Sequence, residues 1–358
     1  MKLEGVAVAV TLALVGCNGA RESTEGAGGR PASDFALPAD STPWKETIVG
    51  FECEHVAVEA QCEGDWCRIP AGCFVKGSPE GEPHHGLSTE VLTAVTMTHA
   101  FLMQRTELTQ AQWGELVELN PSGPSPEYPT APAGTHNDCL QPNCPVGNVN
   151  WWEAAEFANR LSAKEGRQQC YLLEGCHGTV GGGDGADFEC ETFEQATESI
   201  YDCGGYRLPT KVEHEYAARA GTRTAYYSGD LPDEYAEECV RLLPQLDAIG
   251  WYCANAEDRT HPVASKMANR WGLYDILGNA AEWRHNRPVM PDPGAAPWTD
   301  PFGETGNGIS TSDAHEIGGG SMFLSPAFLR SAGRSALDAT TRYPGIGIRL
   351  VRSLQEGE

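Results

Sequence analysis

Residues 271–283 read WGLYDILGNAAEW and place two carboxylates, Asp275 and Glu282, among tryptophans, leucines and two glycines. A bare charge is very costly to bury, so each carboxylate in this apolar stretch needs a proton, a cationic partner or a metal ion. Three explanations are open at this point. One is a salt bridge from Arg270 or Arg284, the second is a bound proton, and the third is a bound metal ion.

The N-terminus has the features of a bacterial export signal. Residues 6–15 (VAVAVTLALV) form an apolar run that is too short to span a bilayer but has the length of a signal-peptide core. The run ends in LVGC, which resembles a lipobox in which Cys17 is acylated and becomes the mature N-terminus. The alternative is an ordinary secretory signal with a chance cysteine. We expect residues 1–17 to be a lipoprotein signal. Asn18 favours the outer membrane, because it is not the aspartate typical of inner-membrane retention.

The segment after the lipobox differs in composition from the rest of the chain. Residues 18–50 are rich in Gly, Ala, Ser, Pro and Glu and contain few apolar side chains. This composition predicts a flexible tether, which would reach roughly 30 Å from the membrane. The remaining residues are enough for one large domain or two modest ones.

The chain is strongly acidic, with 50 acidic against 25 basic residues and a net charge of −25. Such a surface repels nucleic acid and anionic lipid headgroups, so we expect no nucleic-acid partner. Acidity increases solubility, and it also suits calcium, which binds oxygen ligands.

The cysteines predict disulfides. Thirteen are present, and setting Cys17 aside leaves an even number, twelve. In an exported protein this predicts as many as six bridges, most simply within local clusters. No CxxC pair occurs, so a zinc ribbon or a thioredoxin-like site has no support. Residues 170–203 are expected to form a disulfide-bounded insertion. The clusters lie at 53, 62, 67 and 73; 139 and 144; 170, 176, 190 and 203; and 239 and 253.

Local signals predict three helices and several short strands. Thr109 with Gln112 and Thr210 with Glu213 form capping boxes, and Asn150 can cap the helix that follows it. The 41 glycines and 24 prolines require many turns. The prediction is a loop-rich α+β domain without a layered βαβ pattern. Strands are expected within 68–75, 90–98, 101–109 and 345–352.

Six stretches, in order, resemble the formylglycine-generating enzyme (sulfatase-modifying factor) family. The resemblance covers roughly residues 66–352 and implies the family's irregular, C-type-lectin-like fold. We therefore expect one such domain over 51–355, with the insertion at 170–203. The stretches are WCRIPAGCFVKGSPEGEP, FLMQRTELTQAQW, PVGNVNWWEAAEFANRLS, YRLPTKVEHEYAARAGT, NRWGLYDILGNAAEW and the closing GGGS, RSAGR and GIGIRLV.

The same resemblance bears on activity. The family's oxidases convert a cysteine of a sulfatase peptide to formylglycine, using copper(I) held by two cysteines in the closing segment. Copper(I) requires soft thiolates. Aligning RSAGR with the family's RCAAR places Ser331 and Pro326 where the thiols would stand, and the last cysteine of the chain is Cys253. We therefore expect no copper and no formylglycine-generating activity.

Other relatives are iron-dependent sulfoxide synthases, which take metal-binding histidines from an additional helical domain with an HxxxHxE-like motif. Neither that domain nor that motif occurs in this sequence. His261, in THPVASK, occupies a family-typical position and is interpreted as structural.

The resemblance implies calcium at the stretch quoted first. In the family, a turn of the form Asn/Asp-x-x-Gly-x-Ala/Val-x-Glu holds a structural calcium ion, and DILGNAAE matches it position by position. A second family site begins at an Ala-Asn dipeptide, here followed by a shortened loop. The ligands implied for the first site are Asp275, Gly278, Ala280 and Glu282, and those for the second are Asn255, Ala256 and Asp258.

Three functions remain open, because a fold does not determine a function. The first is a lipid-anchored domain in the bacterial envelope that binds a protein or a small ligand. The second is an oxidase or other enzyme of the family with a displaced site. The third is a structural accessory of the envelope. We favour the first, and expect its specificity in the insertion at 170–203.

Overall fold

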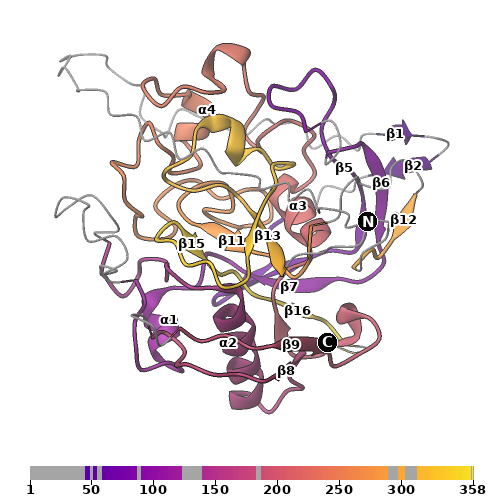
Figure 1. Cartoon of the computed structure of the whole chain (residues 1–358). Helices are drawn as coiled ribbons and strands as arrows, with labels where there is room; N and C mark the ends of the chain where they lie inside the picture. The colour runs from indigo at the N-terminus through magenta and orange to yellow at the C-terminus, as the bar shows by residue number, and fades with distance from the viewer. Residues whose placement is uncertain are drawn as a thin grey trace, which may run out of the picture. The chain divides into compact units, whose positions relative to one another are not determined.

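The computed structural model describes residues 45–48, 51–54, 59–86, 90–122, 139–182, 187–288, 297–302, 313–355 and 357 (Figure 1). All of these belong to one compact unit, 32–358. A second unit, 1–31, lies outside the described residues, as do the expected signal and the lipidation site Cys17. Among the described residues, no helix combines the length and the apolar character needed to cross a membrane.

Two sheets form the centre of the unit, and both are built from short strands. One has the order β10-β16-β7-β4-β3 and is antiparallel throughout. The other has the order β14-β13-β11-β15, and its β11–β15 pair is parallel. The strands of the first are Tyr206–Arg207, Val351–Ser353, Phe101–Gln104, Trp66–Ile69 and Cys62–Glu63; those of the second are Ser335–Asp338, Ala314–Gly318, Ala281–Trp283 and Ile346–Gly347.

Smaller sheets complete the β-structure. A three-stranded sheet has the order β12-β6-β5, and the hairpins β1–β2 and β8–β9 stand by themselves. β1 falls within the stretch predicted to be a tether, and it pairs antiparallel with β2. These strands are Trp298–Thr299, Thr93–Met97 and Gly72–Lys76, then Lys45–Ile48 and Phe51–Glu54, and Tyr171–Glu174 and Thr192–Gln195.

All three predicted helix starts are confirmed. The capping side chains are those of Thr109 on the first helix, Asn150 on the second and Thr210 on the third. Each of them accepts a hydrogen bond from the backbone N–H of the residue three positions later. The first helix is shorter than the apolar pattern suggests, because it stops at Gly114, a residue type that is unfavourable inside helices. The α-helices are α1 (Gln110–Gly114), α2 (Trp151–Lys164), α3 (Lys211–Arg219) and α4 (Pro244–Asp247), and the 3₁₀ helices are η2 (Ile200–Asp202), η3 (Asp233–Tyr235) and η4 (Pro326–Leu329).

The predicted stretches all contain strands, but 68–75 and 345–352 each contribute to two different sheets, and the strand within 101–109 ends at Gln104. The stretch 68–75 contributes to two strands in different sheets, because β4 ends at Ile69 and β5 begins at Gly72. Pro70, between them, has no N–H to donate to a ladder, so the chain leaves the first sheet there. The other predicted stretches contain β6, β7, β15 and β16.

The core lies where helices meet these sheets. α2 packs against β10 and β8 (Figure 1), and its Phe157 stacks on Trp113 of α1 with ring centroids 5.1 Å apart. Both rings are fully buried. The result is a mixed α+β fold in which short elements are joined by long connections, as the glycine and proline content predicts.

Six disulfides tie these connections together, and each one joins two cysteines of the same predicted cluster. Cys170–Cys203 encloses the predicted insertion, and Cys176–Cys190 closes a smaller loop inside it. The disulfides predicted within this segment are therefore confirmed. The other bridges are Cys53–Cys73, Cys62–Cys67, Cys139–Cys144 and Cys239–Cys253.

Candidate functional site

The turn that precedes β11 has a backbone that its sequence makes possible. Asp275, Gly278 and Asn279 all have positive φ angles, of 53°, 106° and 58°. A Cβ atom at Gly278 would lie 2.6 Å from the carbonyl oxygen of Trp251, so only glycine fits there. The Asn279 amide accepts from the backbone N–H of His261 at 2.8 Å and donates to its carbonyl at 3.2 Å. The turn is thereby fixed against the neighbouring loop.

Asp275 is buried, with 1% of its surface exposed. Its Oδ2 accepts a hydrogen bond from the backbone N–H of Ala264 at 2.6 Å, whereas Oδ1 is buried without a hydrogen-bond partner among the described residues. Burial raises the pKa of this carboxyl from 3.8 to about 6. Asp275 therefore has one oxygen available for a proton or a cation.

Glu282 is also buried, and both of its oxygens are hydrogen-bonded. Oε1 accepts from Arg349 Nε at 2.8 Å, and Oε2 lies 3.0 Å from His214 Nε2. Burial acts to raise the pKa of Glu282, but Arg349 and His214 outweigh it, and the pKa is lowered overall. The arginine that reaches this carboxylate is thus Arg349, and not Arg270 or Arg284, the two that the sequence suggested.

The histidine is held in one orientation by an arginine on its other side. Arg284 Nη2 lies 3.0 Å from His214 Nδ1, so Nδ1 accepts a hydrogen bond and Nε2 carries the proton that is donated to Glu282. Burial, followed by the charge of Arg284, lowers the pKa of His214 to about 4. His214 is therefore neutral at pH 7 and does not balance the carboxylate charge.

Glu107 is a third buried carboxylate, and sequence analysis did not single it out. It lies in the loop between β7 and α1, and its Oε1 accepts from the backbone N–H of Ala280 at 3.2 Å. Its Oε2 is buried without a partner in the described ranges. Burial, followed by the charge of Asp275, raises its pKa well above the ordinary value. The available signal was an acid inside a predicted strand, FLMQRTELT.

These carboxylates leave a charge imbalance. If Glu107, Asp275 and Glu282 are all ionised, they carry three negative charges, and Arg349 supplies one positive charge inside the cluster. Two protons or one divalent cation would restore neutrality, which a buried cluster needs. The two unpartnered oxygens are hard donors of the kind calcium prefers.

The donor set limits what kind of ion would fit. In the part of the chain that the structure describes, no group of three or more His, Cys, Asp or Glu side chains is arranged to hold a metal ion. A cation here would have to combine the Glu107 and Asp275 oxygens with backbone carbonyls. Gly278 and Ala280, whose carbonyls the family resemblance implies as ligands, lie in this turn. Calcium tolerates such mixed ligands.

Two of the residues expected at the second calcium site form hydrogen bonds within their own loop. The Asn255 side chain donates to Asp247 Oδ1 at 2.8 Å and accepts from a backbone N–H three residues earlier. The carbonyl of Ala256 is 2.9 Å from His261 Nε2. Asp258 is exposed and has a φ of 56°. The His261 ring also stacks on Trp251, with centroids 3.7 Å apart, and so contributes to packing.

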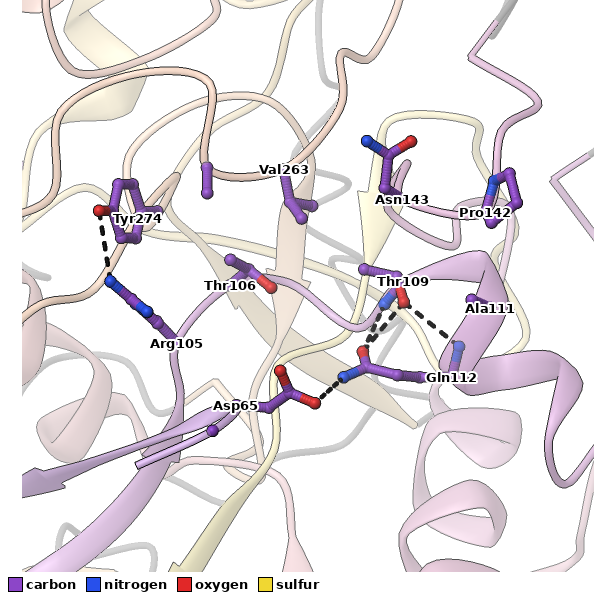
Figure 2. Close-up of a pocket in the computed structure, with 12 residues that line it drawn as sticks. Asp65, Arg105, Thr106, Thr109, Ala111, Gln112, Pro142, Asn143, Val263 and Tyr274 are labelled. Atoms are coloured by element: carbon purple, nitrogen blue, oxygen red, sulfur yellow. Dashed lines mark hydrogen bonds between the residues drawn. The ribbon is translucent and has the colours of Figure 1, made fainter. Parts of the chain in front are cut away.

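A groove of about 510 Å³ is lined by residues that neighbour the buried carboxylates in the chain, and Figure 2 shows these lining residues. Thr106 precedes Glu107 in the chain, Tyr274 precedes Asp275, and Ala264 donates to the Asp275 carboxylate. The groove and the carboxylates therefore share the same backbone segments. The lining residues are Gly64, Asp65, Arg105, Thr106, Thr109, Ala111, Gln112, Pro142, Asn143, Val263, Ala264 and Tyr274.

Two walls of the groove are closed by short disulfide loops. The Cys62–Cys67 hairpin carries Asp65 at its tip, and the Cys139–Cys144 loop carries Pro142 and Asn143. A groove whose walls are fixed before binding loses less conformational entropy when a ligand enters. This geometry suits binding.

Gln112 connects the helix cap to one of these walls. Its Oε1 accepts from the Thr109 backbone N–H at 2.9 Å, as the capping box requires, and its Nε2 donates to Asp65 Oδ2 at 2.9 Å (Figure 2). The start of α1 is thereby tied to the hairpin tip.

The closing segment has no thiols at the positions that would bind copper in the oxidases. Pro326 begins η4, and its carbonyl accepts from the Tyr226 hydroxyl at 2.7 Å. Ser331 is buried, and its backbone N–H donates to the carbonyl of Ala225 at 2.8 Å. All twelve cysteines of the described residues are in disulfides.

Comparison with known proteins agrees with the motifs. The chain is 28% identical over 262 residues to the chaperone protein LppX of Paenibacillus barcinonensis, covering 71% of this chain and 80% of that protein. It is 26% identical over 309 residues to the formylglycine-generating enzyme of Mycobacterium tuberculosis, covering 79% and 96%.

A solved structure supports the fold assignment. Treponema denticola variable protein 1 superposes with a TM-score of 0.57 at 25% identity, covering 87% of this chain and 99% of that one. The family model of the sulfatase-modifying factor enzyme 1-like domain matches residues 54–354. The chain therefore belongs to the sulfatase-modifying factor family, which includes the formylglycine-generating enzymes.

Proposed function

We propose that this protein is a lipid-anchored envelope protein whose sulfatase-modifying factor domain binds a polypeptide without oxidising it. The observation that carries the proposal is the groove with two disulfide-closed walls, because a preformed groove that combines apolar surface with a few polar groups favours binding. The relative named a chaperone supports a polypeptide as the ligand.

The absence of thiols in the closing segment supports a role other than oxidation. Ser331 and Pro326 offer no soft ligand, and every described cysteine is in a disulfide. The competing candidate is an oxidase with a displaced site. The relative named formylglycine-generating enzyme favours it, since that name denotes an enzyme of the family's oxidative chemistry.

We further propose a structural calcium ion at the buried carboxylates, held by Asp275, Glu107 and the carbonyls of Gly278 and Ala280. The unpartnered oxygens and the charge imbalance support it. Glu282 already forms an ion pair with Arg349, so it would position the C-terminal end of this turn and would not itself bind the ion. When bound, the ion would supply positive charge and rigidity. The second family site, at Asn255 and Ala256, has less support, because hydrogen bonds within the loop already engage both residues.

Two properties outside the described geometry complete the proposal. Cys17 would carry the lipid, as LVGC after an apolar run suggests, and the outer membrane would be the location. The fold would be C-type-lectin-like, which the short sheets and long connections support.

A blocking substitution tests the groove. Ala111 is exposed on α1 and lines the groove, so Ala111→Trp would fill it without disturbing the core. Glu118→Trp, at an exposed position outside the lining, is the matched control. The mature protein, purified in detergent and immobilised, is exposed to a random peptide library, and retained peptides are counted by mass spectrometry.

The wild type and Glu118→Trp are expected to retain similar amounts of peptide, and Ala111→Trp to retain far less. Equal retention by all three proteins, or no retention above the bare support, would show that the groove is not a polypeptide-binding site.

A further inference from the structure

We propose that the groove recognises a carboxylate on its ligand and that Arg105 is the residue that binds it. This inference rests on the proposed polypeptide-binding function and names the chemical group that the groove selects. It begins from the contacts of a single exposed arginine in a protein with twice as many acidic as basic residues.

Among the residues that the structure describes, the Arg105 guanidinium contacts only a neutral side chain, that of Tyr274. Nη2 donates to the Tyr274 hydroxyl at 3.4 Å, and the guanidinium carbon lies 5.0 Å from the centre of the same ring (Figure 2). Across the described ranges, Arg105 forms no ion pair. By contrast, Arg330 binds two glutamates and Arg349 binds Glu282. The positive charge of Arg105 is therefore available to a ligand.

The one acidic side chain of the groove is held elsewhere. Asp65 is close in the structure, since its carbonyl accepts from the backbone N–H of Arg105 at 2.8 Å. Its carboxylate, however, accepts from Gln112 Nε2. The capping box at Thr109 fixes the Gln112 amide, so the Asp65 carboxylate is hydrogen-bonded to α1 and forms no ion pair with Arg105 in the described structure.

The rest of the lining suits a peptide segment around that carboxylate. Asn143 presents an amide group that can pair with peptide N–H and C=O groups, and the Thr106 hydroxyl, which donates to the Glu107 carbonyl, can still accept a hydrogen bond. Pro142 and Val263 add apolar surface. The described lining residues include no lysine, and Arg105 is the one cationic side chain among them.

The chemistry favours a carboxylate for a second reason. A guanidinium can form two parallel hydrogen bonds with a carboxylate, and stacking on an aromatic ring limits its rotation before binding. The backbone of Tyr274 is itself fixed, because its carbonyl accepts from Arg349 Nη2 at 2.8 Å. Arg105 is therefore held in place at the edge of the groove.

The carboxylate could come from an Asp or Glu side chain or from a chain terminus. Two capped peptide libraries separate these sources: one ends in a free acid and one in an amide, and both contain Asp–Asn and Glu–Gln pairs at each position. Retention on the immobilised mature protein is compared at low and at physiological salt by mass spectrometry.

We expect acidic members to be enriched over their amide counterparts on the wild type, and more strongly at low salt. Arg105→Gln should reduce this enrichment by about tenfold, which corresponds to about 1.4 kcal/mol. Arg105→Lys should lose part of it. Asp65→Asn should keep or increase it, because a like charge is removed. Arg68→Gln, on β4 outside the groove lining, should leave it unchanged.

Each other outcome has a defined meaning. If the wild type retains peptides without preferring acids, or if Arg105→Gln keeps the preference while melting like the wild type, the carboxylate inference is wrong and polypeptide binding stands. If the wild type retains no peptide in either library, both proposals fail.

Discussion

Glu107 and Asp275 each leave one buried oxygen without a hydrogen-bond partner in the described structure, and this is the strongest sign of a ligand at the scale of single residues. Their pKa values are raised chiefly by burial, so the folded protein holds protons there that the unfolded chain would release. Protons and calcium would then compete for the same oxygens.

This competition predicts how stability depends on pH. Because the folded-state pKa of Asp275 is raised from 3.8 to about 6, its ionisation disfavours folding as pH rises through that window, by roughly 3 kcal/mol. Glu107 acts in the same direction. In chelator, we expect these two groups to lower the melting temperature between about pH 4 and pH 7, and added calcium to reverse most of that loss. Calorimetry with calcium and with chelator across this pH range measures the difference.

Two variants make this prediction sharper. Asp275→Asn should be more stable than the wild type in chelator at pH 7, and calcium should no longer stabilise it, since a ligand stabilises only the state that binds it. Glu282→Ala should also lose the effect of calcium, at the further cost of leaving Arg349 unpaired. Identical melting curves for the wild type in calcium and in chelator would instead favour the Arg349 ion pair as the whole explanation.

At the scale of residues, the sequence correctly predicted that Asp275 and Glu282 are buried, but it did not predict which side chains contact them. The apolar neighbours of Asp275 and Glu282 correctly indicated buried carboxylates. Their partners could not be predicted, because Arg349 lies 67 positions from Glu282 and Glu107 lies 173 positions from Ala280. Contacts at such separations depend on the fold, which local sequence patterns do not contain.

At the scale of elements, the buried pair between β10 and α3 connects three segments. Arg207 donates to both oxygens of Glu213 at 2.7 Å and to Ser353 Oγ of β16 at 2.9 Å. Burial alone would raise the pKa of Glu213, but Arg207 holds it well below its usual range. Glu213 also completes the capping box of α3, so one carboxylate fixes a helix start and a sheet edge.

We predict that Arg207→Met costs about 3–5 kcal/mol, because it leaves a buried carboxylate without its partner. The double variant Arg207→Met/Glu213→Gln should recover part of that loss, since no charge remains to be paired. Urea unfolding followed by circular dichroism measures both. A single variant as stable as the wild type would show that the pair contributes little.

Elements whose signals are local were predicted well. The three helix starts depend on residues three positions apart, and each one is present. Strand limits were harder, because an apolar run does not show which sheet it joins. The division of 68–75 at Pro70 illustrates this, since only the finished sheets separate β4 from β5.

For the whole molecule, the order of the six sequence motifs predicted the family, which composition alone could not do. The family match over 54–354 confirms the resemblance. The six disulfides confirm the pairing that we predicted from the even number of cysteines after Cys17. The groove could not be predicted, because its lining comes from segments between Gly64 and Tyr274 that only the fold brings together.

The lipid anchor is a prediction at this scale. We expect wild-type protein produced in a bacterial host to incorporate labelled fatty acid and to fractionate with the outer membrane, and Cys17→Ser to do neither. A wild type that is exported without a lipid label would point to an ordinary secretory signal.

One measurement tests binding without oxidation most directly. The mature protein is supplied with copper and incubated in air with a cysteine-containing peptide that it retains. The mass of the recovered peptide is then measured by mass spectrometry. We predict that the peptide is bound and keeps the mass of the unmodified cysteine form, because no thiol follows Cys253. Conversion of that cysteine to formylglycine above a protein-free control would contradict the account and establish the protein as an oxidase.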